Sequence, residues 1–210
     1  MRFDEKRITL KDGRVCILRP AEPETETAKA LIDYMIQTAE ETPFLLRYPD
    51  EIHYTIESEM AFLEHAAGDP RIIMMTAAVD GEVAGCASVN PVGGVRRVLH
   101  RGSLAIALKK KYWDLGIGTA MIAYLSGLAQ EAGYEQLELG VIEGNDRAKM
   151  LYEKCGFAEM GKQVDAIRYD DGTYADEILM ILKLTGQKLT ENHMFCKNPP
   201  ASGVACDAAS

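Results

Sequence analysis

Apolar residues recur with two different periods along this 210-residue chain. Over residues 119–131 they return every three to four positions, at Met121, Ile122, Leu125, Leu128 and Ala129. This spacing predicts a helix with one buried face. Residues 104–108 instead form a continuous apolar run of strand length. Because Gly116 and Gly118 lie between the two segments, the sequence predicts a strand, a glycine turn and a helix in direct succession.

The same two periods predict elements along the rest of the chain. Strands are expected at 7–10, 14–18, 71–79, 82–90, 98–108, 136–142, 157–169 and 174–184, and helices at 24–40, 56–67, 118–132 and 146–155. Asp-Gly pairs, which are typical of tight hairpin turns, join three of the strand pairs, at residues 12–13, 80–81 and 171–172. This order predicts an α/β fold with a mixed sheet and helices packed on its faces. Periodicity fades at Thr185, so we expect one domain over 1–185 and a flexible tail over 186–210.

The glycine turn is a candidate anion site. The first amides of a helix have no partner within the helix, and the helix dipole adds positive potential there, so a phosphate is a suitable ligand. The alternative is a turn glycine beside an ordinary helix cap. Two better-known phosphate loops do not match, because no Lys-Ser or Lys-Thr follows Gly118 and because Met121 stands where a dinucleotide fingerprint needs its third glycine.

Composition limits the classes of molecule that this protein is expected to bind and the cellular compartment in which it is expected to work. A net charge of −9 argues against a nucleic-acid partner, which requires concentrated positive charge. No apolar run reaches the length of a membrane span or a signal peptide, so we expect no membrane partner and a cytoplasmic location. The five cysteines are scattered, with neither CxxC pairs nor histidines at metal spacing, which favours free thiols and no metal site. The oligomeric state stays open, a homodimer included.

Two motifs, one strand apart, point to a family. Residues 144–157, GNDRAKMLYEKCGF, resemble the N-x-x-A-x-x-L-Y-x-x-x-G-F signature of the GNAT N-acetyltransferases, and residues 112–119, YWDLGIGT, resemble that family's Q/R-x-x-G-x-G/A loop. The resemblance covers roughly residues 8–184. It implies a mixed, mostly antiparallel central sheet with helices on both faces. It also implies an acetyl-CoA-dependent N-acetyltransferase that acts on a primary amine, either a small molecule or a protein N-terminus. The alternative is a non-catalytic acyl-CoA-binding module, which could dispense with Tyr152.

The resemblance assigns roles to particular residues. The pyrophosphate of acetyl-CoA would lie on the loop formed by Trp113, Asp114, Leu115, Gly116, Ile117, Gly118 and Thr119, in which Trp113 departs from the usual Gln or Arg. The pantetheine arm would pair with Ile106, Ala107 and Leu108. Asn145 would lie near that arm, or cap a helix, or do both. Tyr152 would protonate the departing thiolate, or else only pack. Lys109, Lys110 and Lys111 either face the phosphates or form a solvated charged run.

The general base is not identified by the sequence. In some GNAT relatives a glutamate stands five residues before the motif asparagine, but the matching position here is Gly140. Glu138, Glu143, His100 and a water chain remain as alternatives. The acetyl group would move directly to the amine in a ternary complex, without a covalent enzyme intermediate. We expect the acceptor to bind among the N-terminal helices, the loop at 44–49 and the last hairpin.

Overall fold

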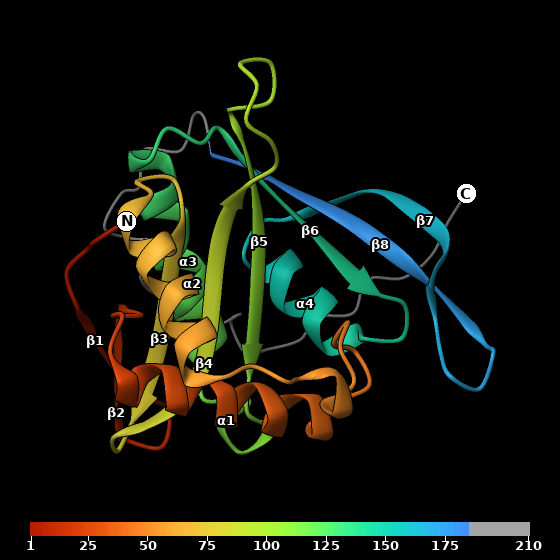
Figure 1. Ribbon diagram of the computed structural model, residues 1–210. Helices are drawn as coiled ribbons and strands as arrows, with labels where there is room; N and C mark the ends of the chain where they lie inside the picture. Colours follow the sequence, from red (N-terminus) through yellow and green to blue (C-terminus); the bar gives the residue numbers. More distant parts are fainter. Residues whose placement is uncertain (185–210) are drawn as a thin grey trace, which may run out of the picture.

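The computed structural model describes residues 1–184, which form one eight-stranded sheet with helices on both faces (Figure 1). Its strands are β1 (Lys6–Thr9), β2 (Val15–Pro20), β3 (Ile73–Val79), β4 (Glu82–Pro91), β5 (Arg101–Leu108), β6 (Gln136–Ile142), β7 (Ala158–Arg168) and β8 (Tyr174–Lys183). Its helices are α1 (Thr25–Glu41), α2 (Ile56–Gly68), α3 (Ile117–Glu131) and α4 (Asp146–Lys154), with short 3₁₀ helices at Pro49–Glu51 and Lys110–Tyr112. The order across the sheet is β1-β2-β3-β4-β5-β6-β8-β7, and only β5 and β6 run parallel. The predicted mixed, mostly antiparallel fold is confirmed.

The predicted hairpins are present, but one strand is shorter than expected. Asp80 and Gly81 both have positive φ, 52° and 83°, as a tight two-residue turn between β3 and β4 requires. Strand β5 begins at Arg101 rather than at residue 98. The reason is local: the Val98 amide donates to the Val95 carbonyl and the Arg101 amide to the Val98 carbonyl, so these residues form turns instead of pairing with β4.

Two hydrophobic cores lie on opposite faces of the sheet. Helices α3 and α4 cover the larger core, and all five apolar positions predicted for the buried face of α3 are buried. Helices α1 and α2 cover the smaller core. On α1, Ile32, Met35 and Ile36 are half-exposed, while Tyr34, Thr38 and Ala39 are buried. The helix is rotated so that Tyr34 reaches the sheet.

Strands β5 and β6 separate along their length. They pair over three positions only: Arg101 with Gln136, Gly102 with Leu137, and Ser103 with Glu138. Beyond these, β5 continues to pair with β4 as far as Leu108, and β6 continues to pair with β8 as far as Ile142. One edge of β5 is therefore without a neighbouring strand from Leu104 onward, and the backbones of the two strands diverge there (Figure 1). The place where they diverge is called the opening below.

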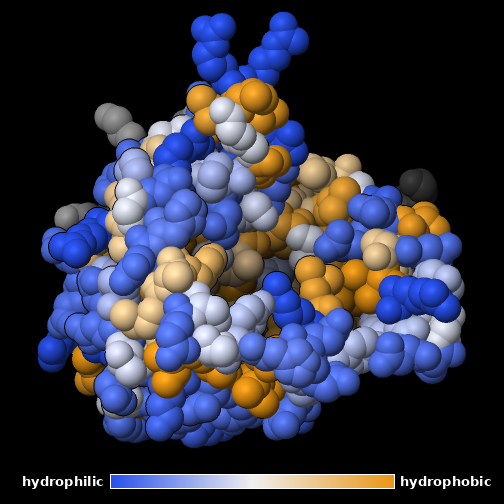
Figure 2. Space-filling view, viewed as in Figure 1, coloured by the Kyte–Doolittle hydropathy of each residue, from blue (hydrophilic) through white to orange (hydrophobic). Residues whose placement is uncertain are grey.

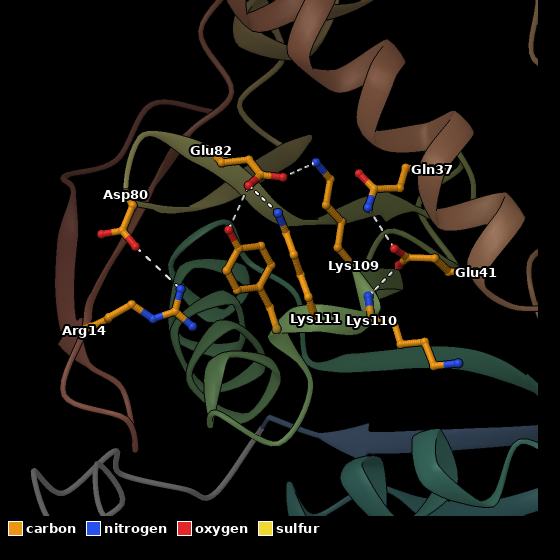
Figure 3. Close-up of polar contacts among 9 residues, drawn as sticks. Arg14, Gln37, Glu41, Asp80, Glu82, Lys109, Lys110 and Lys111 are labelled. Atoms are coloured by element: carbon orange, nitrogen blue, oxygen red, sulfur yellow. Dashed lines mark hydrogen bonds and ion pairs between the residues drawn. The ribbon is translucent and has the colours of Figure 1, made fainter.

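An ionic network holds the end of β5 against the start of β4 (Figure 3). The buried Lys109 donates to Glu82 at 2.7 Å, Lys111 donates to the same carboxylate at 2.6 Å, and the Tyr112 hydroxyl donates at 3.0 Å. The hydrogen bonds from the two lysines lower the pKa of Glu82 from its ordinary value of 4.5 to about 2. Lys109 and Lys111 thus serve this network, a role that the sequence did not indicate.

The expectations for the tail, the cysteines, a metal site and a membrane span can be compared with the structure only over residues 1–184. The predicted tail lies outside the described residues. Within the described residues, Cys16, Cys86 and Cys155 form no disulfide. Within residues 1–184, no group of three or more His, Cys, Asp or Glu side chains could hold a metal ion. None of the helices described there has the length and apolar character that crossing a membrane requires.

Candidate functional site

The opening between β5 and β6 is the centre of the candidate site. Figure 2 shows a hollow in the middle of the face that carries α1 and α2, at the place where these strands separate, with hydrophobic surface around it. The wall from β5 carries three of the predicted cofactor-binding residues, Ile106, Ala107 and Leu108. The motif that supplies Asn145 and Tyr152 forms α4, directly after β6.

Tyr34 determines how the end of β5 faces the opening. Its hydroxyl donates to the Ala107 carbonyl at 2.8 Å and accepts from the Cys86 amide at 3.2 Å, so it bridges one residue pair of the β4–β5 ladder. The Ala107 carbonyl and the Leu108 N–H belong to one planar trans peptide and point in opposite directions. Because the carbonyl points toward β4, the Leu108 N–H points into the opening. No sequence pattern indicated a special role for Tyr34. By helical spacing alone it is one more apolar residue of α1.

The three predicted residues of β5 therefore differ in the direction of their main-chain N–H and C=O groups. Main-chain groups alternate in direction along a strand, so those of Ala107 face β4 and those of Ile106 and Leu108 face the opening. The Leu108 carbonyl is already used, since the Trp113 indole N–H donates to it at 2.8 Å. Ile106 and the Leu108 amide remain as the main-chain groups that a ligand could reach.

The two glycines of the turn have different roles. Gly116 caps α3 with φ at 93°, a conformation that costs a residue with a Cβ about 1–2 kcal/mol. The first amide that bonds within the turn is that of Ala120, which donates to the Gly116 carbonyl at 3.1 Å. The amides of Ile117, Gly118 and Thr119 are thus the free donors at this helix start.

Gly118 lies on the side of α3 that contacts α4. A Cβ built there would lie 2.9 Å from a terminal methyl group of Leu151. The missing side chain lets α3 pack against α4.

Trp113 and Arg147 link the turn to α4. The Arg147 guanidinium lies 4.5 Å from the centre of the Trp113 ring and forms an ion pair with Asp114 at 2.8 Å. Asp114 itself has φ at 62°. The stacking brings a positive charge next to the glycine turn. Arg147 was not singled out from the sequence, although it lies two residues after Asn145 in the second motif.

Asn145 and Tyr152 are both on α4. The Asn145 side chain accepts from the Ala148 amide at 3.2 Å, so it is the N-cap of the helix, one of the two roles considered for it. Tyr152 is 8% exposed, and its ring packs edge-on against Phe157. Burial raises the pKa of Tyr152 to about 12, with a smaller contribution from Cys155. Its hydroxyl is therefore protonated at neutral pH and can donate a proton.

The three side chains considered as general base are poorly placed. Glu138 accepts two hydrogen bonds from Arg101, at 2.6 and 2.7 Å, which lower its pKa. Glu143 forms an ion pair with Lys162 on the surface at 2.8 Å. His100 precedes β5 and lines a separate cavity of about 430 Å³ with Arg71, Arg96 and Glu135, at the end of β5 that is far from the opening.

The segments expected around the acceptor come together on the α1 face. The ring of Phe44 lies beside Gly144, at the start of the second motif. The Tyr48 hydroxyl accepts from the Asp170 amide at 3.1 Å, in the turn between β7 and β8. The loop after α1 thus crosses from α1 to α4 and to the last hairpin.

Comparison with known proteins identifies the fold family. A profile described as "Acetyltransferase (GNAT) family" matches residues 34–157. A GNAT-family acetyltransferase from Streptococcus pneumoniae is 30% identical, with a TM-score of 0.75 over 80% of this chain and 99% of that one. The comparison with curated proteins gave no match.

Two further solved structures share the fold at lower identity. A ribosomal-protein-alanine N-acetyltransferase from Brucella melitensis is 23% identical, with a TM-score of 0.70 over 79% of this chain and 98% of that one. The yncA protein of Salmonella typhimurium, solved with its cofactor acetyl-CoA, is 15% identical, with a TM-score of 0.70 over 82% and 96%. The profile match, the Streptococcus pneumoniae relative and the separated strands agree with the two sequence motifs, and the chain belongs to the GNAT family of acetyltransferases.

Proposed function

We propose that this protein transfers the acetyl group of acetyl-CoA directly to a primary amine in a ternary complex. The observation that carries the proposal is the separation of β5 from β6 next to the free amides of α3. An extended molecule with an anionic end fits such an opening, because a strand edge supplies main-chain hydrogen bonds and a helix start attracts an anion. The acetyl-CoA in the yncA structure of the same fold supports this choice of ligand.

The residues of the opening suit the parts of acetyl-CoA. The amides of Ile117, Gly118 and Thr119 would hold the pyrophosphate, with Arg147 adding a positive charge. Hydrogen bonds to a charged group contribute roughly 1.5–3 kcal/mol each. Several of them supply much of a micromolar affinity, which corresponds to about −8 kcal/mol. The open main-chain groups of Ile106 would pair with the pantetheine arm.

The reaction needs an oxyanion donor and a proton for the leaving group. The Leu108 N–H points into the opening and would stabilise the oxyanion that forms when the amine attacks the thioester. Tyr152 would protonate the thiolate, since its phenol carries its proton at working pH. No cysteine is required as a nucleophile.

The acceptor would enter from the face that carries α1 and the loop at 44–49. The similar structure from Brucella melitensis is a ribosomal-protein-alanine N-acetyltransferase, which makes a protein N-terminus one candidate acceptor. A small metabolic amine is the other. Both are primary amines and require the same chemistry.

The test is release of free thiol from acetyl-CoA in the presence of an amine panel. Peptides that begin with alanine, serine or methionine represent protein N-termini, and spermidine represents small amines. We expect thiol release that depends on one of these amines. Acetyl-CoA binding in calorimetry without turnover of any amine would favour the acyl-CoA-binding module instead, and the absence of binding would overturn both.

A further inference from the structure

The proposed reaction releases a proton from the amine nitrogen, and a group at the opening has to accept it. Glu138 and Glu143 are engaged in ion pairs, and His100 lies far from the opening. We infer that Glu177, on β8, is the general base. This assignment rests on the proposed function and names a residue that no sequence motif indicated.

Strand register places Glu177 on the side of the sheet that faces the acceptor. In the central part of β6 and β8, Leu139, Val141, Ile178 and Met180 point into the core beneath α3 and α4. Side chains alternate along a strand. Gly140, which pairs with Leu179, and Glu177, which pairs with Ile142, therefore lie on the opposite face, the one that carries α1.

The Glu177 side chain lies directly over Gly140. A Cβ built on Gly140 would lie 2.0 Å from Oε1 of Glu177 and 2.4 Å from its Cδ. The carboxylate thus occupies the space that a side chain at position 140 would fill. Only glycine at this position of β6 lets a carboxylate from the neighbouring strand reach that space.

Gly140 and the carboxylate over it lie at the position along β6 where the two strands have just separated. Glu138 is the last residue of β6 in register with β5, opposite Ser103. Gly140 is two residues further, about 6.6 Å along the strand, where β5 and β6 have separated. The carboxylate therefore lies at the narrow end of the opening, across from the part of β5 that leads to Ile106 and Leu108.

The Glu177 carboxylate is also free to accept a proton. Within residues 1–184 it forms neither an ion pair nor a side-chain hydrogen bond, in contrast to Glu82, Glu138 and Glu143. A carboxylate that is tied to a cation accepts a proton less readily. The Glu177 carboxylate therefore faces the opening with oxygens that no other side chain of residues 1–184 occupies.

The step balances without a further reactant. The neutral amine attacks the thioester carbon, a C–N bond forms, and the carbonyl electrons move to the oxygen. The nitrogen is then cationic, and Glu177 removes one of its protons. The carbonyl re-forms, the C–S bond breaks, and the thiolate takes a proton from Tyr152, which regains it from solvent. Glu177 releases its proton to solvent after the amide leaves.

The first test is Glu177→Gln, which keeps the shape and removes the base. With the panel amine that the wild type acetylates fastest, we expect kcat to fall roughly a hundredfold, at the lower end of the range for loss of a general base. The acetyl-CoA dissociation constant should stay within about twofold, since the cofactor lies along β5 and α3. Glu143→Gln, which removes a carboxylate that is paired with Lys162, is the control and should keep the wild-type rate.

The second test relocates the carboxylate. Glu177→Ala should be as slow as Glu177→Gln, and adding Gly140→Glu to Glu177→Ala should restore part of the lost rate, because the new side chain starts from the space that Glu177 filled. Gly140→Ala alone should slow the reaction by displacing Glu177. Wild-type kcat in folded Glu177→Gln, or no recovery in the double variant, would overturn the assignment and leave the proposed function intact. A wild-type chain that neither binds acetyl-CoA nor acetylates any panel amine would overturn the proposed function and this inference together.

Discussion

At the scale of single residues, the hydroxyl of Tyr34 has the most specific role that the structure reveals. Removing it in Tyr34→Phe leaves the Ala107 carbonyl and the Cys86 amide without their bridge, which costs about 1–3 kcal/mol. The peptide that carries the Leu108 N–H then loses its fixed orientation. We expect kcat to fall about tenfold or more, with little change in acetyl-CoA affinity.

A matched control separates orientation from stability. Tyr134 is also buried, and its hydroxyl donates to the Arg71 carbonyl at 2.7 Å, away from the opening. Tyr134→Phe should lose similar stability in thermal unfolding but retain kcat. If both variants kept the wild-type rate, Tyr34 would be a packing residue only.

Tyr152 can be tested in the same way. Tyr152→Phe should lower kcat by about tenfold to a hundredfold, because a thiolate is already a fair leaving group without its proton. The pKa of the phenol is raised from its ordinary value of 10.0 to about 12, so the hydroxyl stays protonated at every pH below that value. The ratio of wild-type to variant rates should therefore be constant from pH 7 to about pH 10. Tyr124→Phe, which removes a surface hydroxyl that donates to the Asp4 carbonyl, is the control. A ratio that falls toward one in this interval would mean that the Tyr152 pKa is not raised, and a ratio of one at every pH would assign the acid role elsewhere.

At the scale of elements, the start of α3 depends on the left-handed conformation of Gly116. Gly116→Ala introduces strain of about 1–2 kcal/mol and displaces the first amides of the helix. If those amides hold the pyrophosphate, loss of one charged hydrogen bond should weaken acetyl-CoA binding about tenfold or more, as calorimetry can measure.

The opposite end of the same helix provides the control. Gly133 has φ at 86°, and a Cβ there would also meet no atom within 4 Å. Gly133→Ala should therefore cost similar stability without affecting affinity. Equal affinity in both variants would mean that the α3 amides do not bind the ligand.

At the scale of the whole molecule, stability toward acid depends on the network around Glu82. Its pKa lies below the ordinary value of 4.5, at about 2, so the folded state binds this proton more weakly than the unfolded state. The resulting stabilisation is present above about pH 4.5 and is lost as the pH falls toward 2. Because the side chain is 38% exposed, solvent screening limits the contribution to about 1 kcal/mol.

The prediction is that Glu82→Gln lowers the free energy of unfolding in urea by about 1 kcal/mol at pH 7 and that the difference narrows below pH 4.5. Glu64→Gln, on the exposed side of α2, should show no such difference at either pH. A deficit that is the same at pH 7 and pH 3.5 would assign the effect to packing of the side chain rather than to its charge.

The sequence by itself determined the elements, the fold class and the family. Asp-Gly pairs indicate hairpins such as the one at Asp80 and Gly81, and the spacing from Met121 to Ala129 indicates the buried face of α3. Both signals are local, so they can be read directly from the sequence. The motif at residues 144–157 could be recognised for the same reason.

Only the tertiary structure decided which residues meet at the opening. Tyr34 reaches Ala107 across 73 positions of sequence, Gly118 makes room for Leu151, and Glu177 covers Gly140 from the neighbouring strand. None of these contacts follows from a period or a motif, since each depends on strand order, register and helix rotation. The two motifs predict where on the chain the site lies, and the pairing of β6 with β8 places the Glu177 carboxylate over Gly140.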